Sequence, residues 1–395
     1  MSGWVLQKAA EFCASVRDGT HDSPKSVEQG GKPLVTSKVV KNGVIRVEDA
    51  YLISEKDYRK INERSKVDRW DILMTMIGTV GECAIVKDNP DYAIKNIALF
   101  KMAGDEEKAK WLYYYLTSPM GQGALRGDFR GSSQQYISLD QLRNLEIPVP
   151  ENDVRSRIVA ILSDYDSAID NARRQIALLE EAAMRLYREW FVVNADPKWE
   201  KRRLWDVCDY FRGVSYTSKE IEGKNGVPLI TLKNIERFGG FREDRSKTFS
   251  GVCKEGSSAG TNDILMAVTD MTKERRLVGH VAMVPDTYDD AQFSMDLIRL
   301  KGKLVSDSFL YAMLRYSTYA DEFAVRASGA NVLHLKPSSL DDCEVVVPKR
   351  VLREKFDSTF VPIVQKKNAL YRAILRLTEA RDRLLPKLMS GEIEV

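Results

Sequence analysis

The chain has 395 residues, of which 44% are hydrophobic and 30% are charged, values that are ordinary for a soluble globular protein of two or three domains. The formal net charge of +3 neither requires nor excludes a nucleic-acid partner. No run of 18 apolar residues occurs, which argues against a transmembrane helix, and the start Met1-Ser2-Gly3-Trp4 has no signal-peptide pattern. Five scattered cysteines and three histidines argue against a zinc site and favour a reducing cytoplasm.

Residues 1–150 predict a globular domain of mixed α/β composition. Short runs rich in β-forming residues, at Ile72–Ile77, Ala84–Val86 and Ile97–Phe100, predict strands in its middle. A helix is expected at about residues 106–118, and a final strand that ends in proline closes the domain.

Residues 151–193 predict one long helix. Its apolar residues follow one another at alternating steps of four and three, which is a mean period of 3.5. A stripe of that period cannot be buried by one helix alone, so it requires a helical partner. The stripe consists of Ile158, Leu162, Tyr165, Ile169, Ala172, Ile176, Leu179, Ala183, Leu186 and Trp190.

Residues 194–349 repeat the pattern of the first domain. Trp199 corresponds to Trp4 at an offset of 195, and Leu310-Tyr311 corresponds to Leu112-Tyr113 at an offset of 198. Because the offset changes along the chain, the two copies differ by insertions in loops. The repeated strands are expected at Ile264–Val268, Val281–Val284 and Leu297–Leu300, and the repeated helix at about residues 306–316.

Residues 350–395 carry a second apolar stripe, 198 residues after the first. Eight of its ten positions are apolar; the exceptions, Lys367 and Arg381, either set the register by meeting acidic partners or reach past an imperfect stripe into solvent. Pro362 is expected to kink this helix or to mark the point at which it begins. Since the chain holds two such helices, we expect them to pair with each other. The ten positions are Phe356, Phe360, Ile363, Lys367, Leu370, Ile374, Leu377, Arg381, Leu384 and Leu388.

Motifs of enzymes are weak in this sequence. Asn89-Pro90-Asp91-Tyr92 differs at its third position from the Asn-Pro-Pro-Tyr motif of adenine methyltransferases, and we interpret it as a turn between two strands. Pro90-Asp91 with Glu106-x-Lys108 fits a nuclease pattern that is permissive enough for chance to explain it better. No GxxxxGK[ST] phosphate loop is present, so ATP binding by this chain is not expected.

Five phrases carry a family resemblance by their order. They are Arg17–Pro24 with its Gly19-Thr20-His21, the weaker echo Arg212–Ser218, Pro228–Ile235, Arg130–Ser138 and the C-terminal Leu384–Ile393. Duplicated in this order and joined by heptad helices, they resemble the specificity (S) subunits of type I restriction–modification systems over essentially the whole chain. The second domain departs from the pattern, because it reads Gly213-Val214-Ser215 and Ser328-Gly329-Ala330-Asn331 at the places of Gly-Thr-His and Gly-Ser-Ser-Gln.

The resemblance implies a fold and a function. Residues 1–150 and 194–349 would be target recognition domains, each reading one half of a split DNA sequence. The helices at 151–193 and 350–395 would pack as an antiparallel coiled coil with pseudo-two-fold symmetry and set the unread spacer. The subunit would have no catalysis and no cofactor of its own. It would recruit two modification subunits, which carry S-adenosylmethionine and methylate adenine, and in the full complex two restriction subunits, which use ATP and Mg²⁺.

Candidate DNA contacts are polar or cationic residues in loops, because Lys and Arg attract phosphates and base edges are read through hydrogen bonds. The Ser132-Ser133-Gln134-Gln135 run is either a loop that faces a DNA groove or a solvated turn. In the second domain, acidic neighbours dilute the basic stretches, so a solvated charged surface is the alternative there. The candidates are Thr20, His21, Ser23, Lys38, Lys41, Arg130, Ser132, Ser133, Gln134, Gln135, Thr217, Ser218, Lys219, Lys233, Asn234, Arg245, Lys273, Arg275, Arg326 and Asn331.

Two other functions are compatible with the sequence. One is a recognition module of another multi-chain restriction–modification type, in which case the partner chain would have a different domain content. The other is a coiled-coil scaffold that binds no DNA, although this would leave the duplicated domains unexplained.

Overall fold

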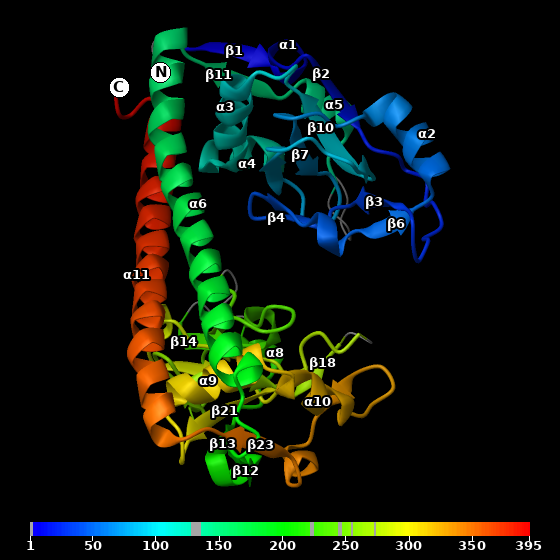
Figure 1. Ribbon diagram of the computed structural model, residues 1–395. Coiled ribbons are helices and arrows are strands. Elements are labelled where there is room, and N and C mark those ends of the chain that lie inside the picture. Colours follow the sequence, from blue (N-terminus) through cyan, green and yellow to red (C-terminus); the bar gives the residue numbers. More distant parts are fainter. Residues whose placement is uncertain (1–2, 128–135, 222–224, 244–246, 254–255, 272–273) are drawn as a thin grey trace. The chain divides into compact units, whose positions relative to one another are not determined.

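The structure is a computed structural model that describes residues 3–127, 136–221, 225–243, 247–253, 256–271 and 274–395. It divides into two units, one formed by Met1–Ala168 with Leu377–Val395 and the other by Ile169–Arg376. Both boundaries fall inside long helices, α6 (Asn152–Arg188) and α11 (Arg350–Met389), so each unit contains one part of each helix (Figure 1). Within the described residues, no helix is long and apolar enough to cross a membrane.

A four-stranded antiparallel sheet lies at the centre of unit 1. Its order is β2 (Ser15–Asp18), β10 (Ile97–Lys101), β7 (Ile72–Thr75) and β8 (Cys83–Ile85). Alternate residues of β7 and β10 point to opposite faces. One set joins a buried cluster with helix α3 (Glu106–Thr117), and the other set joins a cluster with residues of strands β3 and β4. Apolar residues on both faces explain why these strands read as continuous hydrophobic runs in the sequence.

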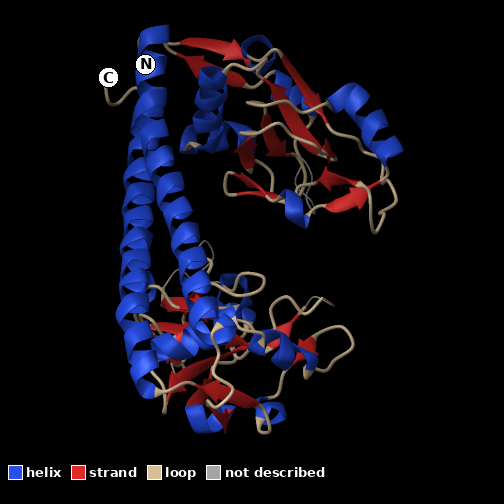
Figure 2. Cartoon of the chain, viewed as in Figure 1, coloured by secondary structure: helices blue, strands red, loops and turns tan. Residues whose placement is uncertain are grey.

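Smaller elements complete unit 1 (Figure 2). A three-stranded sheet has the order β6-β3-β9, in which β3 and β9 are parallel, and β1 pairs with β11 at the end of the globular part. The bounds are β1 Val5–Lys8, α1 Ala9–Phe12, β3 Lys32–Val35, β4 Val40–Lys41, β5 Val44–Ile45, η1 Val47–Asp49, β6 Tyr51–Ile53, α2 Glu55–Ser65, β9 Ala93–Ile94, α4 Pro119–Gly127, α5 Leu139–Arg143 and β11 Glu146–Val149.

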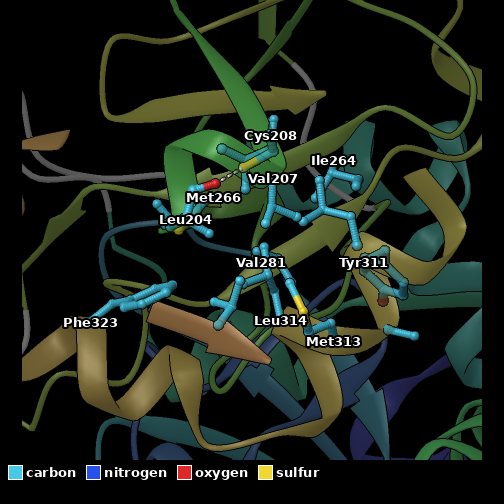
Figure 3. Packing of buried hydrophobic residues seen from close by; sticks show 14 of the residues in the cluster. Leu204, Val207, Cys208, Ile264, Met266, Val281, Tyr311, Met313, Leu314 and Phe323 are labelled. Carbon is cyan, nitrogen blue, oxygen red and sulfur yellow. Dashed lines mark hydrogen bonds between the residues drawn. The ribbon is translucent and has the colours of Figure 1, made fainter. Parts of the chain in front are cut away.

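Unit 2 has a central sheet of the same order. It consists of β13 (Cys208–Arg212), β21 (Leu297–Gly302), β17 (Ile264–Ala267) and β19 (Val281–Met283), again all antiparallel. Helix α9 (Asp307–Tyr316) packs on one face, and Figure 3 shows side chains of β17 and β19 beside those of α9 in one buried cluster.

Two further strand pairings of unit 2 have counterparts in unit 1: β14 pairs parallel with β20 as β3 does with β9, and β12 pairs antiparallel with β23 as β1 does with β11. The bounds of the remaining elements of unit 2 are η2 Glu189–Val193, β12 Glu200–Arg203, α7 Leu204–Val207, α8 Ser218–Ile221, β14 Val227–Ile230, η3 Leu232–Asn234, β15 Lys247–Phe249, β16 Ser258–Ala259, β18 Thr269–Asp270, η4 Asp286–Tyr288, β20 Ala291–Phe293, α10 Tyr319–Val325, β22 Leu333–His334, η5 Pro337–Leu340 and β23 Glu344–Val347.

The two charged positions of the second apolar stripe meet acidic partners. In unit 1, Nη1 of Arg381 donates to Oδ1 of Asp166 at 2.7 Å. In unit 2, Lys367 is paired with Glu180. The prediction that these residues meet acids is thus confirmed, and the alternative that they reach into solvent is wrong, because each carboxylate lies on α6 within reach of the cation.

Two expectations about the long helices need correction. Helix α11 begins at Arg350 and continues across Pro362, so the proline does not mark its start. The buried side chains of Phe356 and Phe360 hold this segment against the core of unit 2. At the end of α6, Tyr187 and Phe191 are buried, whereas the predicted stripe residues Leu186 and Trp190 are only partly so. Leu186 and Trp190 still pack against the same cluster, with the ring centroid of Trp190 6.2 Å from that of Phe356, so the buried side of the helix is wider here than the predicted stripe.

Candidate nucleic-acid interface

In unit 1, the loop after β2 crosses the segment after β9. The N–H of Thr20 donates to the carbonyl of Ile94 at 3.0 Å, and the N–H of Asn96 donates to the carbonyl of Thr20 at 3.1 Å. A third bond of 2.9 Å runs from the N–H of Lys95 to the carbonyl of Val35 in β3. We call residues 19–21 and 94–96 the crossing of unit 1. It joins two segments that lie about 75 residues apart in the sequence.

Glycine is required where this crossing is tightest. A Cβ atom on Gly19 would lie 2.4 Å from the carbonyl oxygen of Ile94, which is a backbone atom that cannot move aside. The first residue of the Gly-Thr-His phrase is therefore explained by packing, and the phrase marks a place where two loops touch.

A buried carboxylate organises the polar side chains of the crossing in unit 1. Asp18 is only 5% exposed, and its Oδ2 lies 2.9 Å from Nε2 of His21. The guanidinium of Arg64 contacts the other oxygen of Asp18. On its far side, Nδ1 of His21 lies 2.8 Å from Oδ1 of Asn96. Since the side chain of His21 is 62% exposed, this network presents a histidine edge and an arginine to solvent.

Two further predicted contacts adjoin the network. Nζ of Lys95 donates to the hydroxyl of Ser23 at 2.5 Å, and the hydroxyl of Thr20 accepts from the N–H of Asp22 at 3.1 Å. The structure thus brings together Thr20, His21 and Ser23, which the sequence placed in one phrase. Lys38 is exposed and Lys41 is half-buried, and they lie on the following loop and on β4.

Unit 2 contains the same backbone crossing, formed by residues 213–215 and 293–295. The N–H of Val214 donates to the carbonyl of Phe293, and the N–H of Met295 donates to the carbonyl of Val214, both at 2.8 Å. The N–H of Ser294 donates to Ile230 in β14, also at 2.8 Å. A Cβ atom on Gly213 would lie 2.3 Å from the carbonyl oxygen of Ser294, so this glycine is required for the same reason as Gly19.

The second region with candidate contacts lies before the last strand of each globular part. In unit 1, the candidates Arg130, Ser132, Ser133, Gln134 and Gln135 lie outside the described residues. The chain becomes described again at Tyr136, and the N–H of Ile137 donates to Met76, just beyond β7, at 3.1 Å.

In unit 2, the corresponding bond runs from the N–H of Leu335 to Val268 at 2.8 Å. The loop before it carries Asn331, which is exposed. Ser328 closes this loop through two backbone hydrogen bonds with His334. Arg326 at its start is held by Asp342 and by the carbonyl of Ser339, so part of its hydrogen-bonding capacity is already used.

The remaining candidates of unit 2 fall into two groups. Arg245 and Lys273 lie outside the described residues, and Arg275 is half-buried with a φ of +53°. Ser218, Lys219 and Lys233 are exposed. Thr217 is exposed as well, but its hydroxyl donates to the carboxylate of Glu220 at 2.8 Å and thereby helps to begin helix α8.

Asn234 must be removed from the candidates. Its side chain is 0% exposed, its Oδ1 accepts from the N–H of Thr231 at 3.0 Å, and its Nδ2 donates to the carbonyl of Arg242 at 3.2 Å. These are the contacts of a capping box on the short helix η3. In the sequence, Lys233-Asn234 resembles a DNA contact because asparagine is common both as a helix cap and in hydrogen bonds to base edges.

Sequence reasoning missed four residues of the two crossings. Arg64 and Asn96 in unit 1 and Met295 in unit 2 lie outside the recognised phrases, whereas Asp18 lies in the phrase Arg17–Pro24 but is not among the candidate contacts. Asn96 carried one usable signal, because asparagine tolerates positive φ and here adopts +53°.

The motifs of enzymes do not assemble into a site. Asn89–Tyr92 forms the turn between β8 and β9, as predicted, and Asp91 pairs with Lys32 at 2.5 Å. A pocket of about 440 Å³ adjoins this turn, but Nζ of Lys101 in its wall is already bound to Asp71 at 2.6 Å. Among the described residues, no group of histidine, cysteine and acidic side chains is arranged to hold a metal ion.

Comparisons with known proteins show which proteins this chain is similar to. Residues 1–181 match the family described as the type I restriction modification DNA specificity domain. The type I restriction enzyme MjaIX specificity subunit of Methanocaldococcus jannaschii is 24% identical over 436 residues, which cover 99% of this chain and 94% of that protein. The MjaVIII specificity subunit of the same organism is 20% identical over 404 residues, which cover 93% and 87%.

A solved structure shares the fold. The crystal structure of the type I restriction–modification system S subunit from M. genitalium superposes with a TM-score of 0.51 at 16% identity, covering 98% of this chain and 96% of that one. Residues 1–181 therefore match a type I restriction modification DNA specificity domain, and over nearly its whole length the chain is similar to type I specificity subunits, the family that its sequence phrases resemble.

Proposed function

We propose that the chain is the DNA-recognition subunit of a type I restriction–modification complex and that each globular part reads one half of a bipartite target. The observation that carries this proposal is the crossing that occurs once in each unit with the same three backbone hydrogen bonds. Two copies of one scaffold with different side chains are what a protein needs to read two different half-sites. Residues 1–150 and 194–349 are the proposed recognition domains.

The exposed polar residues around the crossings are proposed to make two kinds of DNA contact, some with phosphates and others with base edges. Lysines such as Lys38, Lys219 and Lys233 suit phosphates, and contacts of that kind fix the position on the duplex without reading its sequence. His21 and Asn96, held in place by Asp18, suit base edges because a rigid side chain discriminates better than a mobile one. The Ser132–Gln135 run and Asn331 remain proposed contacts of the second region.

The long helices are proposed to pair as an antiparallel coiled coil that sets the unread spacer. In support, Glu180 pairs with Lys367, whereas Tyr187, seven residues further along α6, lies with its ring centroid 6.0 Å from that of Phe356, eleven residues earlier in α11. The Arg381–Asp166 pair adds a second polar contact between the helices. A polar pair in an apolar interface favours one register over others.

The chain is proposed to act without catalysis of its own. It would recruit two modification subunits that carry S-adenosylmethionine and, in the full complex, two restriction subunits that use ATP and Mg²⁺. Two half-sites would give higher sequence specificity than one, because the binding free energy lost to mismatches, roughly 1–3 kcal/mol per base pair, adds across both half-sites.

The test maps N6-methyladenine across the host genome with and without the gene. We expect that a two-part motif with an unread gap loses its methylation on deletion. Exchange of residues 1–150 for another recognition domain should then change one half of the motif and leave the other half and the gap intact. An unchanged motif after this exchange would refute the assignment of one half-site to each domain.

A further inference from the structure

Asn96 and Met295 occupy the same backbone position in the two units. Each donates its N–H to the carbonyl of the second residue of the crossing loop, Thr20 in unit 1 at 3.1 Å and Val214 in unit 2 at 2.8 Å. Each also follows a residue whose N–H is bound to the parallel strand β3 or β14. The scaffold therefore presents these two side chains from equivalent places.

The chemistry at these places is different. In unit 1, Asn96 contacts His21, and Lys95 reaches Ser23, so donors, acceptors and a cation share the surface. In unit 2, the position of His21 is taken by Ser215 and that of Lys95 by the fully buried Ser294. The side chains of Ser215 and Met295 are both exposed there, and the thioether sulfur of Met295 accepts from the hydroxyl of Ser215 at 3.3 Å.

Met295 is exposed in a way that core packing does not explain. Its side chain is 60% exposed, and among the described residues it belongs to none of the buried apolar clusters of unit 2. The next residue, Asp296, accepts a backbone hydrogen bond of 2.9 Å from Val268, so the main chain beside Met295 is fixed while its side chain projects. A fixed backbone with a flexible apolar side chain can fit an apolar group closely.

On a surface that faces the major groove of DNA, one apolar group is available for recognition. The C5-methyl group of thymine is the only methyl that unmodified base pairs present there, and apolar side chains read it by contact. We propose that Met295 reads a thymine methyl group in the half-site of unit 2, at the position where unit 1 reads a base through Asn96. This inference rests on the proposed function and adds the chemistry by which the two half-sites differ.

The test uses the complete complex with its modification subunits. The half-site of unit 2 is first assigned as the half of the methylated motif that changes when residues 194–349 are exchanged. Binding is then measured on duplexes in which each thymine of that half-site, on either strand, is replaced by deoxyuridine, which lacks only the methyl group. At one position we expect roughly fourfold weaker binding, the value for removing one buried methyl-sized group.

Variants assign that loss to one side chain. In Met295→Ala, the thymine and deoxyuridine duplexes should bind equally. The matched control is Leu304→Ala, because Leu304 is 49% exposed and follows β21 at the end remote from Met295, and it should keep the wild-type discrimination. Asn96→Ala should weaken discrimination in the other half-site and leave the deoxyuridine effect unchanged.

The outcomes separate this inference from the function on which it rests. A bipartite motif whose unit 2 half contains no thymine, or none that responds to deoxyuridine, would overturn the role of Met295 and leave the proposed function standing. Discrimination that survives in Met295→Ala would overturn it as well. If no bipartite motif depends on the gene, the proposed function fails and this inference fails with it.

Discussion

At the scale of single residues, the crossings depend on glycines that no other residue can replace without moving backbone. We expect Gly19→Ala to lower the free energy of unfolding by about 1–3 kcal/mol, the range for overpacking, because the added Cβ meets the carbonyl of Ile94. Gly123 provides a matched control in helix α4, since nothing lies within 4 Å of a Cβ placed there. Gly123→Ala should raise stability by about 0.5–1 kcal/mol, as for alanine in a helix interior. Urea unfolding measures both, and equal effects would contradict the packing argument.

The half-buried Glu243 in unit 2 should make stability depend on pH. Burial raises the pKa of the Glu243 carboxyl to about 7, and the hydroxyl of Thr287, which donates to it at 2.9 Å, and Arg173 offset only part of this. Between its ordinary pKa of 4.5 and about 7, the folded state keeps a proton that the unfolded state releases. The free energy of unfolding therefore decreases as pH rises through this window.

Glu243→Gln should remove that decrease. The amide is neutral and can still accept from Thr287, so the variant should match the wild type near pH 5 and exceed its stability near pH 8. Urea unfolding at the two pH values measures the difference. Glu379→Gln, at an exposed position on α11, should retain the wild-type pH dependence. A variant at position 243 that loses stability at pH 8 as fast as the wild type would exclude Glu243 as the cause.

Some of these residues could be predicted from the sequence and others could not. The Gly19-Thr20-His21 phrase was visible because its residues are adjacent. Asn96 and Met295 were not, since what defines them is a hydrogen bond to a loop about 75 or 80 residues earlier. Asn234 was misassigned because its sequence neighbours resemble those of a surface loop, whereas its side chain is fully buried and bonded to Thr231 and to the carbonyl of Arg242.

At the scale of elements, the periodicity of apolar residues predicted the longer strands and helices but not the shortest strands. The strands at 72–77, 97–100, 264–268 and 297–300 and the helices at 106–118 and 306–316 all occur close to their predicted bounds. Strands of two residues, such as β9 and β18, have too few positions to show an alternation. In unit 1, β9 nevertheless contributes Ile94 to the crossing, so the local geometry of that site could not be predicted from sequence patterns.

The ion pair between the long helices in unit 2 should be measurable as a coupling. Burial alone would raise the pKa of Glu180, but Lys367 and Arg315 lower it below its ordinary value, which indicates that the paired charge is stabilised. Glu180→Lys and Lys367→Glu should each destabilise unit 2. The double variant should recover about 0.5–3 kcal/mol of their summed cost, as for residues in contact. Recovery will be incomplete, because Arg315 also lies 3.3 Å from Glu180 and would then face a lysine.

A control for this cycle lies on the same helix. Glu181 and Arg185 form an exposed i,i+4 pair, for which the coupling should be at most about 0.5 kcal/mol. Thermal unfolding of the four proteins in each cycle gives both values. Equal coupling in the two cycles would mean that the Lys367–Glu180 pair contributes no more to register than a surface pair does.

At the scale of the whole molecule, the sequence predicts a duplicated plan, and the central sheets of the two units have the same strand order. This prediction rests on distances along the sequence, such as the 198 residues between the two apolar stripes. Such distances stay the same when substitutions remove a local motif. The side chains of the two crossings have diverged while their backbone hydrogen bonds are the same. Under the proposed function, such a scaffold would let the recognised half-site change through substitutions at a few positions while the core stays the same.

The proposed spacer predicts a change of target from a change of helix length alone. Seven residues inserted into each long helix, after Ala168 in α6 and after Arg376 in α11, keep the apolar stripes in phase. They add about 10.5 Å of helix, or about three base pairs at 3.4 Å each. The unread gap of the methylated motif should therefore lengthen by about three base pairs while both half-sites stay the same.

The rate of methylation should fall in this variant. Three base pairs turn the duplex by roughly 100° when one turn takes about 10.5 base pairs, whereas a heptad turns an α-helix by about 20° short of two full turns. One recognition domain must then reach around the duplex or twist it, at a cost in binding. A two-residue insertion at the same points is the control, since it turns the following stripe by about 200° to the opposite face of each helix and should lower stability instead of lengthening the gap. Genome-wide methylation maps decide the matter: a gap of unchanged length in the heptad variant would mean that the helices do not set the spacer.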